Sequence, residues 1–261
     1  MPKNLAKTNN FSITFVSMNR VSKSEVIAKL QRDILCWEGF KPAKAIGAGL
    51  IGLGPVEAAF PNQIFPVGAV HEFICATQED AAATGGFISG LLKTLMKNGS
   101  GCLWVSKSRK LFPPGLSLYG ISPDRILFVD VNSEKDILWA TEEALKCQGM
   151  AAVICELGEV SFNQSRRLQL VCERSKVTSF IIRSDPQKIT QTACVARWLV
   201  TSIASQTKGD LPGVGFPRWR AELLKVRNGN PASCEVEWSK GKFKVFQQQD
   251  AVEASVKRKY A

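Results

Sequence analysis

Apolar runs and helical periodicity alternate along the middle of this chain. Five short runs are apolar almost throughout and predict strands at 69–75, 102–106, 126–130, 151–156 and 178–183. Apolar residues spaced three or four apart predict helices at 81–96, 133–147 and 162–175. Strands that are apolar on both sides and alternate with helices are typical of a parallel sheet covered on both faces.

Polar residues indicate where two of these helices begin. Thr77 and Asp80 have the spacing of an N-cap pair in front of the first helix, which would then run through residue 96. Ser161 and Gln164 form an S-x-x-Q capping box in front of the last helix. These local signals agree with the periodicity and support the helix assignments.

The pattern changes after residue 195. Four segments look like strands without helices between them, at 196–204, 220–227, 234–238 and 242–246. Turn residues separate the last three, at 228–231 and 239–241. The predicted fold class is therefore α/β, with a mostly parallel twisted sheet flanked by helices and an antiparallel β extension at its C-terminal edge.

The beginning of the chain differs from the middle. Residues 1–20 are polar and irregular, and Ser22 and Glu25 form an S-x-x-E box that predicts a helix over 23–38. Four glycines between 47 and 54 predict a flexible joint or a set of tight turns. The predicted parts are a flexible N-terminus with a helix at 1–45, a core domain at 46–246, and a polar, basic tail at 247–261.

Composition narrows the class of protein without naming a function. The 261 residues carry 34 basic and 23 acidic side chains, a net charge of +11, which makes DNA a candidate partner. No apolar run is long enough to span a membrane and no secretory pattern occurs, so we expect a cytoplasmic protein without membrane contact. Eight cysteines without a CxxC pair predict buried free thiols, and a single histidine leaves no ligand cluster for a metal.

The sequence between Lys44 and Lys93 contains no lysine or arginine. This stretch includes the connection from the 69–75 strand to the next helix, where a phosphate-binding loop would need glycines, a lysine and a Ser or Thr. The residues available for such a degenerate loop are Thr77, Thr84, Gly85 and Gly86. Glu79 and Asp80 would repel a triphosphate, so we expect no cofactor, with ATP as the alternative.

Glu156 and His71 are the other candidates for chemistry. Glu156 ends the strand at 151–156, where nucleotide-binding proteins often place an acid directed at magnesium. A strand-end carboxylate that meets solvent or a lysine is the alternative. His71 has no nucleophile placed beside it by a motif, so a structural role is expected, and no catalytic residue is predicted.

The order of these elements resembles that of RecA. The segments that carry the resemblance are 51–54, 65–72, 102–106 and 152–156 in the core, and 190–198 and 218–229 in the terminal β region. The last of these, continuing to Trp238, is most similar to the ImuA family, which is RecA-like in fold and accessory to error-prone DNA repair. The resemblance covers roughly residues 50–246.

Several positions that RecA-type ATPases use have no counterpart here. The first-loop lysine is missing from 76–86, and Ser106, Lys107 and Ser108 stand where these ATPases carry a glutamate. Only Glu156 can stand in for the acid of the fourth strand, and the DNA-binding loop after the fifth strand is reduced to 184–190. The resemblance thus implies a retained fold that has lost hydrolysis and filament-style DNA binding.

The function that the resemblance implies is a non-catalytic RecA-like adaptor in SOS-type mutagenesis by translesion DNA synthesis. The implied partners are ImuB, a catalytically inactive relative of Y-family polymerases, and an error-prone C-family DNA polymerase, with RecA and a direct DNA contact as further candidates. Two alternatives stay open. One is a divergent P-loop ATPase of the RecA type in DNA repair, with Lys107 or Lys188 reaching the phosphates; the other is a basic, sequence-independent DNA-binding protein.

Aromatic residues beside arginines predict a partner-binding surface near the end of the chain, because Trp and Arg are favoured at binding hot spots. The predicted residues are Arg218, Trp219, Arg220 and Trp238. The alternative is that the two tryptophans pack the terminal β edge. The helix predicted at 23–38 is a second candidate surface.

Overall fold

The chain divides into two compact units, residues 1–47 and residues 48–261. The computed structural model describes residues 23, 26, 30, 51–96, 99–184, 186, 189–205 and 214–246. In the first unit the described residues are Lys23, Val26 and Leu30, and all three are helical. The rest of the helix predicted at 23–38 and the tail at 247–261 lie outside the described residues, so the predicted three-part division stays a prediction.

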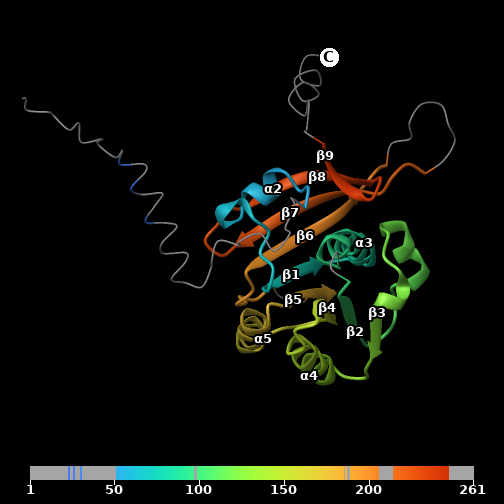
Figure 1. The fold of residues 1–261 in the computed structure, drawn as a ribbon, viewed down its shortest axis with the longest axis vertical. Coiled ribbons are helices and arrows are strands. Elements are labelled where there is room, and N and C mark those ends of the chain that lie inside the picture. The colour runs from blue at the N-terminus through green and yellow to red at the C-terminus, as the bar shows by residue number, and fades with distance from the viewer. Residues whose placement is uncertain are drawn as a thin grey trace, which may run out of the picture. The chain divides into compact units, whose positions relative to one another are not determined.

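A nine-stranded mixed sheet forms the centre of the second unit, in the order β3-β2-β4-β5-β1-β6-β7-β8-β9 (Figure 1). The strands are β1 Val70–Cys75, β2 Gly101–Ser106, β3 Ile126–Asp130, β4 Met150–Leu157, β5 Thr178–Ser184, β6 Ala196–Ile203, β7 Arg218–Val226, β8 Ala232–Ser239 and β9 Lys242–Phe246. Pairing is parallel from β3 to β6 and antiparallel from β6 to β9. The predicted α/β class with an antiparallel C-terminal extension is confirmed.

The helices between the parallel strands are α3 Gln78–Leu95, α4 Glu134–Leu145 and α5 Phe162–Ser175. Both predicted capping boxes are present, from Thr77 and Asp80 at α3 and from Ser161 and Gln164 at α5. The short elements escaped prediction because such brief turns show little periodicity. They are α2 Pro55–Ala58 and the 3₁₀ turns η1 Pro61–Gln63, η3 Pro113–Tyr119 and η4 Pro123–Arg125. None of the described helices is long and apolar enough to cross a membrane.

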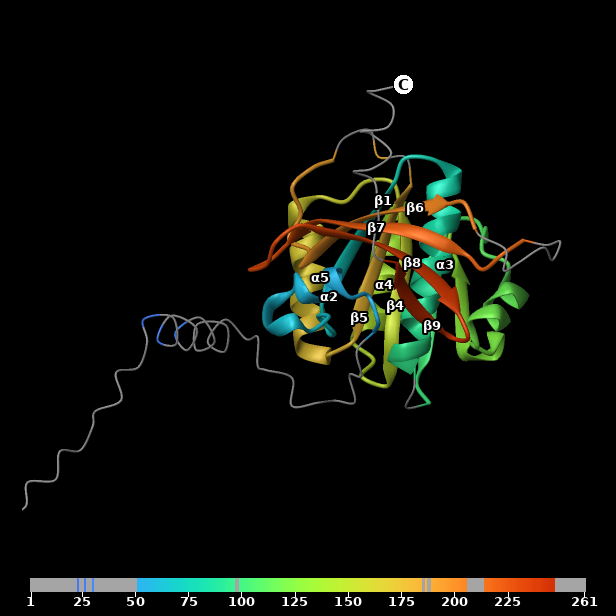
Figure 2. The same ribbon diagram turned by 90° about the horizontal axis from the view of Figure 1, so that it is seen from above.

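The sheet separates two hydrophobic cores because successive side chains of a strand point to opposite faces. On β1, Phe73 and Cys75 belong to the core that α3 completes, whereas Val70 belongs to the core that α4 and α5 complete. Figure 1 shows α4 and α5 together on one side of the sheet and α3 on the other. Figure 2 shows β6 and β7 crossing the direction of β1, β4 and β5, so the sheet is strongly twisted.

Residues 51–54, the described part of the glycine-rich segment, bend sharply; residues 47–50 lie outside the described residues, so the choice between a flexible joint and tight turns stays a prediction. Gly52 and Gly54 have φ angles of 93° and 50°, in the region that favours glycine. The Glu57 carboxylate accepts hydrogen bonds from the backbone N–H groups of residues 51, 52 and 53, at 3.0, 3.2 and 3.4 Å. A Cβ at Gly52 would lie 3.1 Å from the Phe243 carbonyl oxygen, so this segment packs closely on β9.

Candidate functional site

The connection from β1 to α3 is two residues long, and the chain's own side chains cap the helix. The Thr77 hydroxyl accepts a hydrogen bond from the Asp80 backbone N–H at 3.1 Å, and the Asp80 carboxylate accepts one from the Thr77 N–H at 3.0 Å. Phosphate binds at helix N-termini through free N–H groups and the positive end of the helix dipole. Here Glu79 and Asp80 place negative charge in the first turn, which opposes an anionic ligand.

Thr84, Gly85 and Gly86 lie inside α3, which corrects their grouping with a phosphate loop. Thr84 is fully buried, and its hydroxyl accepts a hydrogen bond from the Cys75 thiol at 3.3 Å. These three residues belong to the body of the helix and cannot wrap around a phosphate.

The glycines of α3 have a packing role. A Cβ at Gly86 would stand 2.6 Å from the Tyr119 hydroxyl and 3.0 Å from the Trp219 ring. A Cβ at Gly90 would stand 2.5 Å from the Phe243 ring. Real Cβ atoms do not approach neighbours this closely, so glycine lets α3 lie against η3 and the antiparallel extension.

Glu156 lies near the carboxyl end of β4, but its carboxylate is engaged within the protein. Oxygen Oε1 accepts a hydrogen bond from the Trp104 indole Nε1–H at 2.8 Å. Burial raises the pKa of the Glu156 carboxyl, against opposing contributions from Trp104 and the charge of Lys110. Among the described residues no group of three or more His, Cys, Asp or Glu is placed to hold a metal.

Lys107, one of the two lysines considered for an ATPase, lies near α4. Its Nζ is 4.0 Å from the Glu134 carboxylate at the start of that helix, and both side chains are about half exposed. Lys188, the other lysine, lies outside the described residues.

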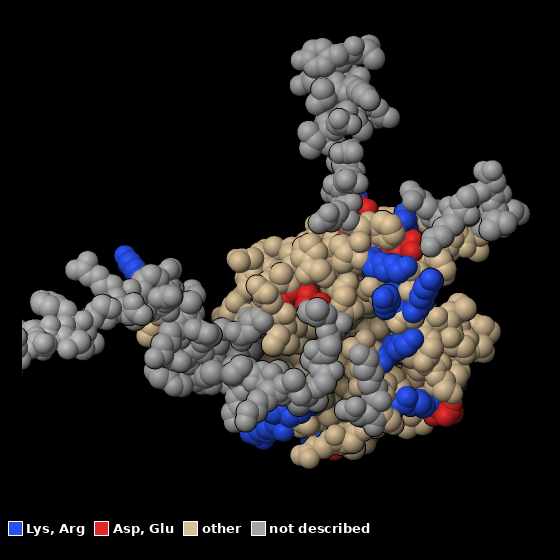
Figure 3. Space-filling model, turned by 45° about the horizontal axis from the view of Figure 1, so that its top comes forward, with Lys and Arg blue, Asp and Glu red and all other residues tan. Residues whose placement is uncertain are grey.

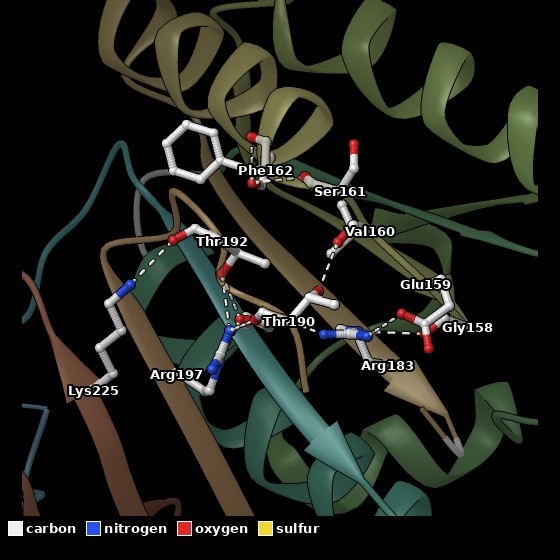
Figure 4. Close-up of polar contacts among 12 residues, drawn as sticks. Gly158, Glu159, Val160, Ser161, Phe162, Arg183, Thr190, Thr192, Arg197 and Lys225 are labelled. Atoms are coloured by element: carbon white, nitrogen blue, oxygen red, sulfur yellow. Dashed lines mark hydrogen bonds and ion pairs between the residues drawn. The ribbon is translucent and has the colours of Figure 1, made fainter. Parts of the chain in front are cut away.

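The sequence patterns missed a buried ion cluster centred on β1. Glu72 is fully buried and accepts hydrogen bonds from three side chains: Arg183 Nη1 at 2.9 Å, Arg197 Nε at 2.8 Å and the Thr192 hydroxyl at 2.7 Å. The two arginines come from β5 and β6, the strands on either side of β1. Arg183 also donates to Glu159 at 2.5 Å (Figure 4). The sequence did contain a signal: each of three apolar strand segments includes one charged residue. Such residues are expected to be buried, and buried charges must be paired.

The same cluster holds the chain between β5 and β6. Arg197 donates to the Thr190 carbonyl at 2.5 Å, and Lys225 donates to the Thr192 carbonyl at 3.1 Å. Figure 4 shows the guanidinium of Arg197 pointing toward Thr190 and Thr192. This connection is where a RecA-type DNA-binding loop was expected. In this connection the Thr190 carbonyl and both the carbonyl and the hydroxyl of Thr192 instead bond side chains of the protein's own strands.

His71 has the structural role that was predicted for it. Its ring is fully buried, Nε2 donates to the Pro66 carbonyl at 2.7 Å, and Nδ1 accepts from the Trp198 indole at 3.3 Å. Burial lowers its pKa to about 4, against an opposing contribution from the Pro66 bond. The ring is therefore neutral at pH 7, with both nitrogens used inside the core.

Free thiols are buried at six of the seven described cysteines, largely as predicted. The buried cysteines are Cys75, Cys102, Cys155, Cys172, Cys194 and Cys234, whereas Cys147 is exposed. Burial raises the pKa of Cys75 to about 11 and that of Cys155 to about 12. These thiols stay protonated at neutral pH and are poor nucleophiles.

The tryptophans of the predicted partner-binding surface are buried. Trp219 and Trp238 are 4% and 5% exposed and belong to the core between α3 and the extension. The alternative interpretation, that they pack the terminal β region, is the one the structure shows. The prediction that the rings of Trp219 and Trp238 contribute to an exposed partner-binding surface is therefore corrected.

Arg218 and Arg220 lie on the face of β7 opposite to Trp219 and form cross-strand ion pairs with β8. Arg218 Nε is 3.0 Å from Glu237, and Arg220 Nη2 is 2.8 Å from Glu235. The Arg218 side chain is 10% exposed and that of Arg220 is 46% exposed. Their role in partner binding stays a prediction, and Arg220 is the more accessible of the two.

Fold and site together define an α/β protein with a mixed sheet, in which the first strand–helix connection is closed by the chain's own caps. No protein-family model matches the chain. Two curated relatives, both named Protein ImuA and found in two strains of Caulobacter vibrioides, are each 31% identical to it over 188 residues. The matched region covers 67% of this chain and 77% of each relative. The chain belongs to the ImuA family.

Proposed function

We propose that this protein is a non-catalytic RecA-like adaptor in SOS-type error-prone translesion DNA synthesis in the cytoplasm. It links an ImuB-like relative of Y-family polymerases to an error-prone C-family polymerase, with RecA as a further candidate partner. Membership of the ImuA family supports the place in such a system. The observation that carries the non-catalytic part is the capping of α3 by Thr77 and Asp80.

A nucleotide-driven motor needs polar groups that change partners between nucleotide states. Three polar pairs near the carboxyl ends of β1 and β4 are bonded internally: Thr77–Asp80, Cys75–Thr84 and Trp104–Glu156. ATP would have to break these bonds and overcome the negative charge of the first turn of α3. This arrangement supports a scaffold that binds partners without hydrolysis.

Calorimetric titration with ATP and magnesium, together with a hydrolysis assay on the full chain, tests the non-catalytic part. We expect neither saturable binding nor turnover. Robust turnover that is lost in Glu156→Gln would overturn this part and favour a divergent RecA-type ATPase.

Capture of purified ImuB-like protein and C-family polymerase by the immobilised chain tests the adaptor part. We expect both partners to be retained by the wild type and capture to weaken several-fold when Arg218→Ala and Arg220→Ala are combined, because arginines often dominate interfaces. Arg166→Ala with Arg174→Ala removes the same charge from α5 and serves as the matched control.

Arg220→Ala alone is tested as well, in case the double variant does not fold. This single variant should stay folded, because its partner Glu235 is more exposed than Glu237. Undiminished capture by this folded variant would exclude Arg220 from the interface. Failure of the wild type to retain either partner would overturn the adaptor role itself.

A further inference from the structure

Four lysines gather at the end of the β8–β9 hairpin, and we call them the hairpin lysines. They are Lys93, Lys240, Lys242 and Lys244. Lys240 and Gly241 form the two-residue turn, and Lys242 and Lys244 alternate on β9 with the buried Phe243. Lys93 comes from the last turn of α3, and its Nζ lies 5.8 Å from the centre of the Trp238 ring on β8. Lys93 thus reaches the turn of the hairpin from a distant part of the sequence, on the side of β9 that packs against α3, whereas Lys242 and Lys244 lie on the other side of β9 from Phe243.

Across the described residues, no ion pair includes any hairpin lysine. Other basic side chains do have acidic partners, such as Lys146 with Glu143 and Arg109 with Asp130. Glu237 lies opposite Lys244 in the strand register, but its carboxylate pairs with Arg218. Figure 3 shows Lys and Arg side chains following one another across one face of the molecule.

Two features of the turn fix the charges in position. Lys240 has a φ of 52°, a left-handed conformation that costs a residue other than Gly, Asn or Asp about 1 kcal/mol. The Lys93 amino group lies against Gly241 and Gly120, where a side chain at either glycine would meet it. Lys240 therefore occupies a turn position that Asn would fill with less strain, and the Lys93 amino group lies against the adjacent Gly241.

We infer that the hairpin lysines bind the phosphate backbone of DNA. Protein interfaces are depleted in lysine and enriched in arginine and aromatic residues, whereas this cluster has lysine alone. A lysine ammonium is a compact charge that serves well as a phosphate contact. Lys242 and Lys244 are two strand residues apart, about 6.7 Å, and the alternation of a strand places both on the same face of β9.

The electrostatic setting agrees with this assignment. The whole chain has a net charge of +11, and the sequence after β9 contains Lys257, Arg258 and Lys259. Contacts of this kind carry no base recognition, so the surface binds DNA without sequence preference. This inference goes beyond the adaptor role and does not depend on it, because a DNA contact can exist with or without ImuB-like partners.

Fluorescence anisotropy with labelled oligothymidine and with a labelled mixed-sequence duplex tests the inference. The variant combines Lys242→Gln with Lys244→Gln. The matched control combines Lys135→Gln in α4 with Lys146→Gln at the C-cap of that helix, which removes the same charge from a different part of the molecule. Each is measured over a salt series after thermal unfolding shows that it is folded.

We expect the wild type to bind, and the β9 variant to bind about tenfold more weakly at low salt. Its slope of log affinity against log salt should fall by about 1.4 on the single strand or about 1.8 on the duplex. The control should keep the wild-type affinity and slope. Whichever DNA shows the larger loss identifies the form that the hairpin contacts.

Equal loss in the two double variants would overturn the inference, because net charge alone would then explain binding. Absence of wild-type binding at low salt would overturn it as well. Unchanged DNA binding by the β9 variant with loss of ImuB capture would assign the hairpin lysines to a protein partner instead.

Discussion

The carboxyl end of β1 and the end of the β8–β9 hairpin differ in whether their polar side chains have bonding partners within the chain. Around β1, Thr77, Thr84, Glu72 and Glu156 all have bonding partners within the chain. At the hairpin, none of the four lysines has an ion-pair partner among the described residues. Internally bonded groups stabilise the fold and resist exchange for a ligand, whereas unpaired surface charges meet a ligand with little loss. This difference supports the proposal that the extension, and not the carboxyl end of β1, binds a ligand.

The largest effect should come from Glu72. Replacing it in Glu72→Gln removes the charge that compensates the buried arginines and should lower the free energy of unfolding by about 3–5 kcal/mol. The matched variant on the extension is Glu235→Gln, whose pair with Arg220 is partly exposed and contributes under about 1 kcal/mol. Denaturant unfolding of both variants measures the two losses of unfolding free energy. Equal losses would contradict the difference between the two regions.

Acid should weaken the β1 region through His71. Its pKa is about 4 in the folded protein against 6.5 for the free side chain, so between these values the unfolded state binds the proton and the folded state does not. Stability should therefore be full above pH 6.5 and fall by up to about 3 kcal/mol as the pH drops to 4.

His71→Phe is the variant that isolates this contribution. It should be less stable at pH 7, because the Pro66 carbonyl and the Trp198 indole lose their partner. Its stability should nevertheless change less between pH 6.5 and 4 than that of the wild type. An unaltered pH dependence in urea unfolding would show that other groups cause the acid effect.

Replacing either of two glycines of α3 by alanine should change the free energy of unfolding, and the two changes should have opposite signs. Gly90→Ala forces a methyl group against the Phe243 ring of the extension and should destabilise by about 1–3 kcal/mol, less the gain in helix propensity. Gly85→Ala meets only Leu111 at 3.8 Å and should stabilise by up to about 1 kcal/mol. Thermal unfolding compares them, and two variants with the same sign would contradict the close approach of α3 to β9.

The smallest effect should be a gain at the hairpin turn. Lys240→Asn places a residue suited to the left-handed conformation and should raise the free energy of unfolding by up to about 1 kcal/mol. The same change should weaken DNA binding. Loss of stability in denaturant unfolding would indicate that Lys240 supports the fold rather than a ligand.

Elements with local signals could be predicted well. Apolar runs set β1 to β5 within one or two residues, and the capping boxes set the start of α3 and α5, because these signals depend on neighbours only a few residues away. The stretch without lysine also includes the connection from β1 to α3, whose position follows from the order of the elements alone.

The side-chain partners could not be predicted in the same way. Glu72 bonds arginines 111 and 125 residues away, and which arginine reaches it depends on the order β5-β1-β6 in the sheet. The burial of Trp219 and Trp238 depends on α3 and the extension packing together. A local pattern of Trp beside Arg is the same at a binding surface and in a core.

The sequence by itself determined the class of the fold, the direction changes of the sheet and the absence of a lysine between residues 44 and 93. These properties follow from periodicity and composition, which act over short distances along the chain. Only the tertiary structure decided that Glu72 holds β5 and β6 to β1, and that Lys93 of α3 reaches the β8–β9 hairpin. Charge pairing and desolvation depend on distance in space, and the folded sheet sets that distance.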